Sequence, residues 1–174
     1  MKVYNALALA AQLHGNQKYG KEPYMLHVAQ VVEVLRYYGV EDEDVLAAGV
    51  LHDVVEDCDV TVGVLEQLFG ARVAKIVELV SNPNVSEATQ DESSRKLSRK
   101  EKHLLQYPKL SRNREARIVK MADRLANVMS GDFLDMYRNE HELFMSFIYA
   151  PDYHDHMYGD IELSMRRDLD NLLK

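Results

Sequence analysis

The chain has 174 residues, a formal net charge of −7 at pH 7 and a hydrophobic content of 47%. This length suits one compact domain with a real core, and the acidic balance argues against sequence-independent binding of nucleic acid. The single cysteine excludes an internal disulfide and a cysteine-based zinc site. Without a signal-like N-terminus or a long apolar stretch, we expect a cytoplasmic protein outside the membrane.

Apolar residues recur at helical spacing through the first half of the chain. The basic segment 14–21 contains two glycines and predicts a turn-forming loop. Acids at 41–44 suit the start of a central helix that we expect to run to Asp57. Thr61 and Gly70 suit the cap and the stop of a further helix. The helices predicted here cover 3–13, 23–39, 41–57, 62–69 and 71–79.

A polar stretch divides the second half. Residues 81–94 predict a long mobile loop, and the basic run at 95–102 is either a solvated helix face or a set of phosphate ligands. Pro108 is expected to separate this run from the next helix, and the His and Asp residues at 152–156 are expected to be solvated. The remaining helices are predicted over 116–129, 134–149 and 161–173. With no repeat and no strand-like alternation, the sequence predicts an all-α, compact single domain over 1–174.

The segment Leu51-His52-Asp53-Val54-Val55-Glu56-Asp57 carries the first chemical signal. In a continuous helix, Glu56 and Asp57 would lie one turn from His52 and Asp53. Three acids so close repel one another, and a divalent cation relieves that repulsion. Neutral imidazole and carboxylate suit Mn²⁺, Fe²⁺ or Zn²⁺. The alternative is a solvated acidic helix end.

Two further residues could join such a site. A lone histidine such as His27 is usually a core or boundary residue. Asp123 interrupts an apolar helix, with Asn127 one turn further on the same side, and a buried aspartate needs a partner. A salt bridge to Lys120 or Arg124 would supply one, and a metal ion would be another.

Four motifs occur in an order that resembles the HD-domain superfamily, and more narrowly the hydrolase domain of the RelA/SpoT family and its small stand-alone, MESH1-like relatives. They are His-x-x-Gln with Glu-Pro-Tyr-x-x-His (14–27), Leu-His-Asp-x-Val-Glu-Asp (51–57), Phe-Gly-x-x-Val-x-x-Ile-Val (69–77) and Lys-Met-Ala-Asp-Arg-Leu-x-Asn (120–127). In the basic loop, which is about one residue short, Tyr19 stands where the family often has a basic residue.

The resemblance implies an HD helical bundle with one divalent metal ion, typically Mn²⁺ with Fe²⁺ or Zn²⁺ as alternatives. It implies metal-dependent hydrolytic removal of the 3′-pyrophosphate from ppGpp or pppGpp, giving GDP or GTP and pyrophosphate. The implied residues fall into three groups: metal ligands His27, His52, Asp53 and Asp123; water-activating acids Glu56 and Asp57; and substrate contacts Lys18, Lys21, Lys96, Arg99 and Asn127.

Other functions stay open at this point. The same site could act on a nucleoside 5′-monophosphate or NADPH, because base recognition depends on loop geometry. A catalytically silent nucleotide-binding regulatory module would have no use for the Glu56-Asp57 pair, and an interaction protein without a ligand would leave Asp123 unexplained. We expect a small-molecule nucleotide partner and, from the length, no second enzymatic domain. The sequence does not give the oligomeric state.

Overall fold

The computed structural model describes residues 1–82, 98–131, 133–148 and 159–174. The loop expected over 81–94, apart from its first two residues, lies outside these ranges. Lys96 and the His154 and His156 cluster also lie outside them. Among the described residues, no helix combines the length and the apolar character needed to cross a membrane.

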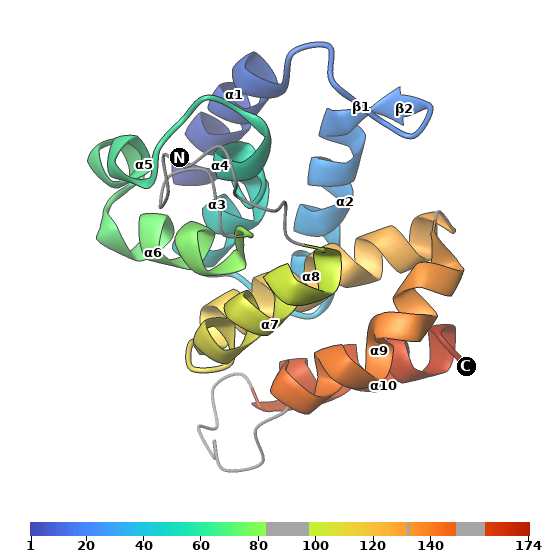
Figure 1. Cartoon of the computed structure of the whole chain (residues 1–174). Helices are drawn as coiled ribbons and strands as arrows, with labels where there is room; N and C mark the ends of the chain where they lie inside the picture. The colour runs from blue at the N-terminus through green and yellow to red at the C-terminus, as the bar shows by residue number, and fades with distance from the viewer. Residues whose placement is uncertain (83–97, 132, 149–158) are drawn as a thin grey trace, which may run out of the picture.

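Helices form almost all of the described secondary structure (Figure 1), which confirms the all-α prediction. The first half holds α1 (Lys2–His14), α2 (Tyr24–Tyr37), α3 (Glu43–Val50), α4 (Val54–Asp57), α5 (Val62–Phe69) and α6 (Ala71–Val80). The second half holds α7 (Arg99–Leu110), α8 (Arg114–Ser130), α9 (Leu134–Ile148) and α10 (Gly159–Leu172). The Thr61 side chain accepts from the Val64 N–H, so the predicted cap of α5 is confirmed.

Helix α8 lies at the centre of the packing. It contacts α2, α3, α6, α7, α9 and α10, and Figure 1 shows it running behind α7 toward α2. Apolar α8 side chains such as Ile118, Ala122 and Leu125 are fully or almost fully buried. Asp123, Arg124 and Asn127 are buried on the same helix. The helix therefore brings charged groups into the interior, where each needs compensation.

The predicted continuous helix to Asp57 is wrong. Helix α3 ends at Val50, and a turn over 51–53 precedes α4. The His52 Nδ1 atom lies 2.8 Å from the Gly49 carbonyl oxygen, which in an unbroken helix would accept from the Asp53 N–H. The histidine side chain thus takes the place of a backbone donor, and the turn places His52 and Asp53 where two helix ends meet.

The segment between α1 and α2 is a small hairpin rather than a plain loop. Strand β1 (Lys18–Tyr19) pairs antiparallel with β2 (Glu22–Pro23), with Lys18 opposite Pro23. Gly20 in the turn has a φ of 59°, which favours glycine. Two-residue strands carry no detectable alternation, so hydrophobic periodicity could not predict them.

Pro108 does not separate two helices, because α7 continues through it to Leu110. The proline lies in the last turn of α7, so its missing N–H removes only the bond to the Leu104 carbonyl. Leu104 is at the exposed surface, where water can hydrate that carbonyl. The cost of the proline is therefore small at this position.

Gly49 allows α3 to approach α2 closely. An added Cβ would lie 2.5 Å from the Leu35 Cδ1 atom, and Leu35 is fully buried, so its side chain has little room to move.

We expect Gly49→Ala to lower the free energy of unfolding by about 1–3 kcal/mol through overpacking, measured by urea denaturation. The matched control is Gly63→Ala on α5, where the added Cβ would meet only Thr61 Oγ1 at 3.8 Å. That control should raise stability by roughly 0.5–1 kcal/mol, and equal stability of the two variants would contradict the close contact.

Candidate metal centre and cavity

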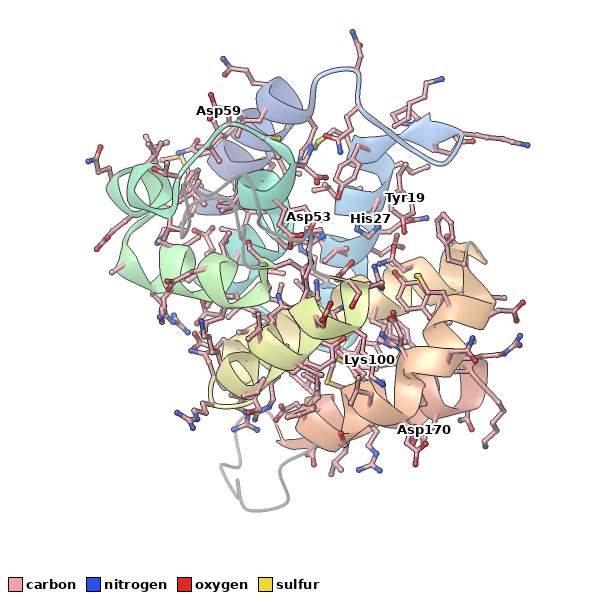
Figure 2. All side chains as sticks on the ribbon, in the orientation of Figure 1. Tyr19, His27, Asp53, Asp59, Lys100 and Asp170 are labelled. Carbon is pink, nitrogen blue, oxygen red and sulfur yellow. The ribbon has the colours of Figure 1, made fainter. Side chains whose placement is uncertain are left out.

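Four side chains from separate parts of the chain converge below the hairpin. His27 comes from α2, His52 and Asp53 from the turn before α4, and Asp123 from α8. The ligand atoms of His27, His52 and Asp53 lie within 4.8 Å of one another. Figure 2 shows Tyr19, His27 and Asp53 close together between the hairpin and α7.

The distances are those of a shared centre. The His52 Nε2 atom lies 2.9 Å from Asp53 Oδ2 and 3.3 Å from His27 Nε2. Asp123 Oδ1 lies 3.3 Å from His27 Nε2 and 3.7 Å from His52 Nε2. The residues predicted as metal ligands are therefore brought together by the fold.

The donor set fits a divalent cation. With Nδ1–H of neutral His52 donating to the Gly49 carbonyl, its Nε2 lone pair faces the other three groups. Imidazole nitrogen and carboxylate oxygen facing one point are ligands that Mn²⁺, Fe²⁺ and Zn²⁺ accept. The backbone bond on the opposite ring nitrogen fixes the tautomer, as is usual for metal-ligating histidines.

The electrostatics of the centre also favour a positive charge. Burial alone would lower the pKa of His52, but the Asp53 and Asp123 carboxylates raise it to about 9. Burial opposes ionisation of Asp53, yet the adjacent His52 lowers the pKa of that carboxyl to about 2. A proton and a metal ion compete for the same Nε2 atom, so the centre attracts either cation.

Asp123 has a partner on each carboxylate oxygen. Lys120 Nζ lies 3.1 Å from Oδ2, while the Asn127 amide donates to Oδ1 at 2.8 Å. Burial opposes ionisation of Asp123, but Lys120 and the two histidines hold its pKa well below the usual range. The expected salt bridge to Lys120 is therefore present, and it leaves Asp123 Oδ1 facing the two histidines. Arg124 instead donates to the Tyr137 carbonyl.

A hydrogen-bonded network of α1, the following segment and α2 orients Asp53 and Asp57. The Tyr24 hydroxyl donates to Asp53, and the His14 ring stacks on Tyr24 with centroids 4.3 Å apart. Gln17 connects His14 to Asp57. Its Oε1 atom contacts His14 Nδ1 at 2.8 Å, and its Nε2 atom donates to Asp57 Oδ2 at 2.8 Å. The first sequence motif therefore orients acids of the second.

Glu56 is held separately. One of its oxygens accepts from the Asn82 backbone N–H at 2.6 Å and the other from the Asn82 side-chain amide at 2.8 Å. Burial raises the pKa of Glu56, and Lys120 opposes that shift. A carboxyl group with a raised pKa in a fixed orientation is suited to accept a proton from water.

These groups open into a cavity of about 190 Å³. Its lining combines metal-centre residues, acids, cations and aromatic rings: Tyr19, His27, Asp53, Glu56, Asp57, Asn82, Arg99, His103, Tyr107, Lys120, Asp123, Arg124, Asn127, Tyr137 and Phe144. Three larger hollows among the described residues, of about 560, 580 and 740 Å³, are lined by none of the metal-centre residues.

The predicted substrate contacts are placed unequally. Arg99 and Asn127 line the cavity, whereas Lys18 and Lys21 are exposed on the hairpin and do not line it. Tyr19 lies there instead. Its ring stacks on His27 with centroids 4.8 Å apart, and its hydroxyl donates to Asn127 Oδ1 at 2.6 Å.

Several residues of the cavity wall are not marked by any sequence pattern. His103, Tyr107 and Phe144 are buried there, and from sequence alone they are ordinary helix-face or core residues. From the sequence, Lys120 and Arg124 are expected only as possible salt-bridge partners of Asp123, and their place in the fourth motif is the signal that could have marked them as cavity residues. Their position in the cavity follows from α7 and α9 packing on α8.

Residues 6–151 match the HD domain family. The chain is 37% identical over 123 residues to the Danio rerio guanosine-3′,5′-bis(diphosphate) 3′-pyrophosphohydrolase MESH1, covering 68% of this chain and 63% of that protein. It is 36% identical to Homo sapiens MESH1, covering 73% of this chain and 68% of that protein. The chain thus spans just under two thirds of the length of the Danio rerio relative.

Solved structures show the same architecture. One is described as a metazoan ortholog of SpoT that hydrolyzes ppGpp; it matches with a TM-score of 0.73 and 26% identity, covering 98% of this chain and 94% of that chain. A Listeria monocytogenes protein with 22% identity and a TM-score of 0.64 covers 87% of this chain and 96% of its own, and shares the fold.

The Tyr24 hydroxyl provides a test of the metal centre. Tyr24→Phe removes only the hydrogen bond to Asp53 and keeps the ring stacked on His14. We expect metal affinity to fall by about 10–100-fold, as for other groups that orient a ligand, with the fold intact. The metal affinity is measured by isothermal titration calorimetry of the two proteins with the metal ion.

The control for that substitution is Tyr38→Phe. The Tyr38 hydroxyl donates to Asp168 at 2.7 Å, away from the cluster, so this variant should bind metal like the wild type. Wild-type affinity in Tyr24→Phe as well would show that the hydroxyl does not support the ligand.

Proposed function

The chain belongs to the HD domain family, and from that premise we propose that it is a metal-dependent pyrophosphohydrolase that removes the 3′-pyrophosphate of ppGpp or pppGpp. The products would be GDP or GTP and pyrophosphate. The observation that carries the proposal is the cavity lined by His27, Asp53 and Asp123, three of the four proposed metal ligands, together with Glu56, Asp57 and Lys120. The named activities of the MESH1 relatives support the choice of substrate.

The proposed metal ligands are His27, His52, Asp53 and Asp123, and the proposed ion is Mn²⁺, with Fe²⁺ or Zn²⁺ as alternatives. Mixed imidazole and carboxylate ligands are compatible with each of these ions. When bound, such an ion lowers the pKa of a coordinated water and neutralises phosphoryl charge.

The chain's own residues would then handle protons and orientation. Glu56, fixed by Asn82 and buried enough to raise its pKa, would accept the proton of the attacking water. Asp57, which Gln17 holds at 2.8 Å, would orient that water. Lys120 keeps a positive charge, because Asp123 and Glu56 raise its pKa despite the opposing effect of burial, and this charge would face the phosphoryl oxygens.

Further cationic and polar residues would contact the rest of the nucleotide. We assign this role to Lys18 and Lys21 on the exposed hairpin, to Lys96, and to Arg99 and Asn127, which line the cavity. Arg99 already pairs with Glu140 at 2.7 Å, so its charge is partly compensated before substrate binds. The cytoplasmic location and the single-domain organisation expected from the sequence stay predictions.

A hydrolysis assay with added Mn²⁺ tests the proposal. We expect the protein to release pyrophosphate and GDP from ppGpp. Nucleoside 5′-monophosphates, nucleoside triphosphates and NADPH are assayed beside it as alternative substrates. Glu56→Gln should retain metal and lose about 10²–10⁴-fold in kcat, the usual contribution of a general base. Asp53→Ala should lose metal and activity together, because it removes a ligand.

The control for Glu56→Gln is Glu78→Gln, which breaks only a surface pair with Lys75 and should leave kcat unchanged. Turnover of another panel member, with ppGpp untouched, would overturn the substrate assignment. Full metal content in Asp53→Ala would overturn the ligand assignment. Metal binding without any turnover would favour a silent nucleotide-binding module.

A further inference from the structure

The cavity is acidic at one end and basic at the other. Its acidic groups are Asp53 from the turn before α4, Glu56 and Asp57 from α4, and Asp123 from α8. The wall built by α7, α8 and α9 carries three cations, Arg99, Lys120 and Arg124, of which Lys120 lies beside the acidic groups. Lys120 is paired with Asp123 and Arg99 with Glu140, whereas Arg124 is compensated less completely.

Arg124 is 4% exposed and lies against two aromatic rings. Its guanidinium carbon is 4.9 Å from the Tyr137 centroid and 4.4 Å from the Phe144 centroid. One of its terminal nitrogens donates to the Tyr137 carbonyl at 2.8 Å, and the other lies 3.9 Å from Glu140. Its Nε has no hydrogen-bond partner among the described residues.

A buried guanidinium in this state is costly unless an anion completes its shell. Glu140 does little to complete it, because its closer contacts are to Arg99, at 2.7 and 3.3 Å. The aromatic rings contribute cation–π attraction but accept no conventional hydrogen bond. Arg124, which lines the cavity, therefore keeps one donor without a partner among the described residues and a charge that is only partly compensated.

His103 adds a second available group on the same wall. Its side chain is buried and stacks on Tyr107 with centroids 4.7 Å apart, and its Nδ1 has no hydrogen-bond partner in the part of the chain that the structure describes. Burial lowers the pKa of His103 to about 4, so the ring is neutral at pH 7. It can hydrogen-bond a phosphoryl oxygen without adding charge.

The size of the cavity limits what can lie between the two ends. A volume of about 190 Å³ is below the roughly 300–1,000 Å³ of pockets that enclose whole small molecules. It corresponds to about six waters at roughly 30 Å³ each. Two linked phosphoryl groups fit this space, while a nucleoside would lie outside it.

We propose that Arg124 and His103 form an anion subsite for the phosphoryl group farther from the metal centre. This inference rests on the proposed function, because it assumes that the metal centre holds the nearer, scissile phosphoryl group. The subsite makes the cavity selective for a ligand with two linked phosphoryl groups over a ligand with one. It therefore disfavours nucleoside monophosphates and the single 2′-phosphate of NADPH.

Calorimetric binding of inorganic pyrophosphate and inorganic phosphate to the metal-loaded full chain tests the subsite without turnover. Free metal is held constant by a metal buffer, so that chelation by pyrophosphate is equal in all samples. The wild type should bind pyrophosphate at least about tenfold more tightly than phosphate, since the distal group gains charged hydrogen bonds. Arg124→Gln should remove most of that preference and leave phosphate binding within about twofold.

Arg117→Gln is the matched control. Arg117 lies on the same helix with 2% exposure, but its guanidinium pairs with Glu162 at 2.7 Å and it does not line the cavity. The preference for pyrophosphate should survive this substitution even where stability falls. His103→Phe keeps a ring on Tyr107 and removes the nitrogen, and it should lower pyrophosphate affinity by a few fold.

Equal binding of the two anions by the wild type would overturn the subsite without any mutant. An unchanged preference in folded Arg124→Gln, or an equal loss in Arg117→Gln, would also overturn it. If Arg124→Gln does not fold, the wild-type ratio and His103→Phe decide the matter. A strong preference for pyrophosphate in a protein that does not hydrolyse ppGpp would leave the subsite standing and reject the proposed substrate.

Discussion

The structure depends on how one buried carboxylate is compensated. Asp123 projects from the central helix into the interior, where an unpaired carboxylate would be strongly unfavourable. One oxygen faces Lys120, and the other faces Asn127 and the two cluster histidines. Because these partners come from α2, α8 and the turn before α4, the same electrostatic requirement that stabilises Asp123 also fixes the geometry of the metal centre.

Around that centre, orientation comes from short connecting segments as well as from the long helices. The turn after α3 allows His52 to use a backbone carbonyl as its hydrogen-bond acceptor, which directs the other ring nitrogen to the cluster. The hairpin after α1 stacks Tyr19 on His27. Gln17, in the same connection, links His14 to Asp57. Helices supply rigid positions, and the connections supply the hydrogen bonds that select a single rotamer.

The cavity lining combines groups that suit a metal ion with groups that suit an anion. Acids and imidazoles at one end suit a divalent cation, and the cations on the opposite wall suit anionic oxygens. Glu140 pairs with Arg99 and Asp123 pairs with Lys120, so Arg124 is the least compensated of the three cations. A ligand with linked negative groups can satisfy both ends at once, which is the physical basis for selectivity in such a small space.

The sequence by itself determined the helical class, most helix boundaries and the identities of the converging polar residues. Helical periodicity and caps such as Thr61 are local patterns, and the four motifs are recognised from residue types in a fixed order along the chain. Asp123 within an apolar run already required a buried partner. Such features depend on neighbours within a few residues, so a sequence pattern records them.

Only the tertiary structure decided which side chains share the cavity. At the break between α3 and α4, the His52 side chain takes the Gly49 carbonyl that the Asp53 N–H would use in a continuous helix. Hydrophobic periodicity does not reveal such a replacement. Tyr19 reaches Asn127, and Arg124 lies between rings of α9, through contacts between distant parts of the chain. Burial and charge at those positions arise from packing, and packing is a property of the whole fold rather than of any one segment.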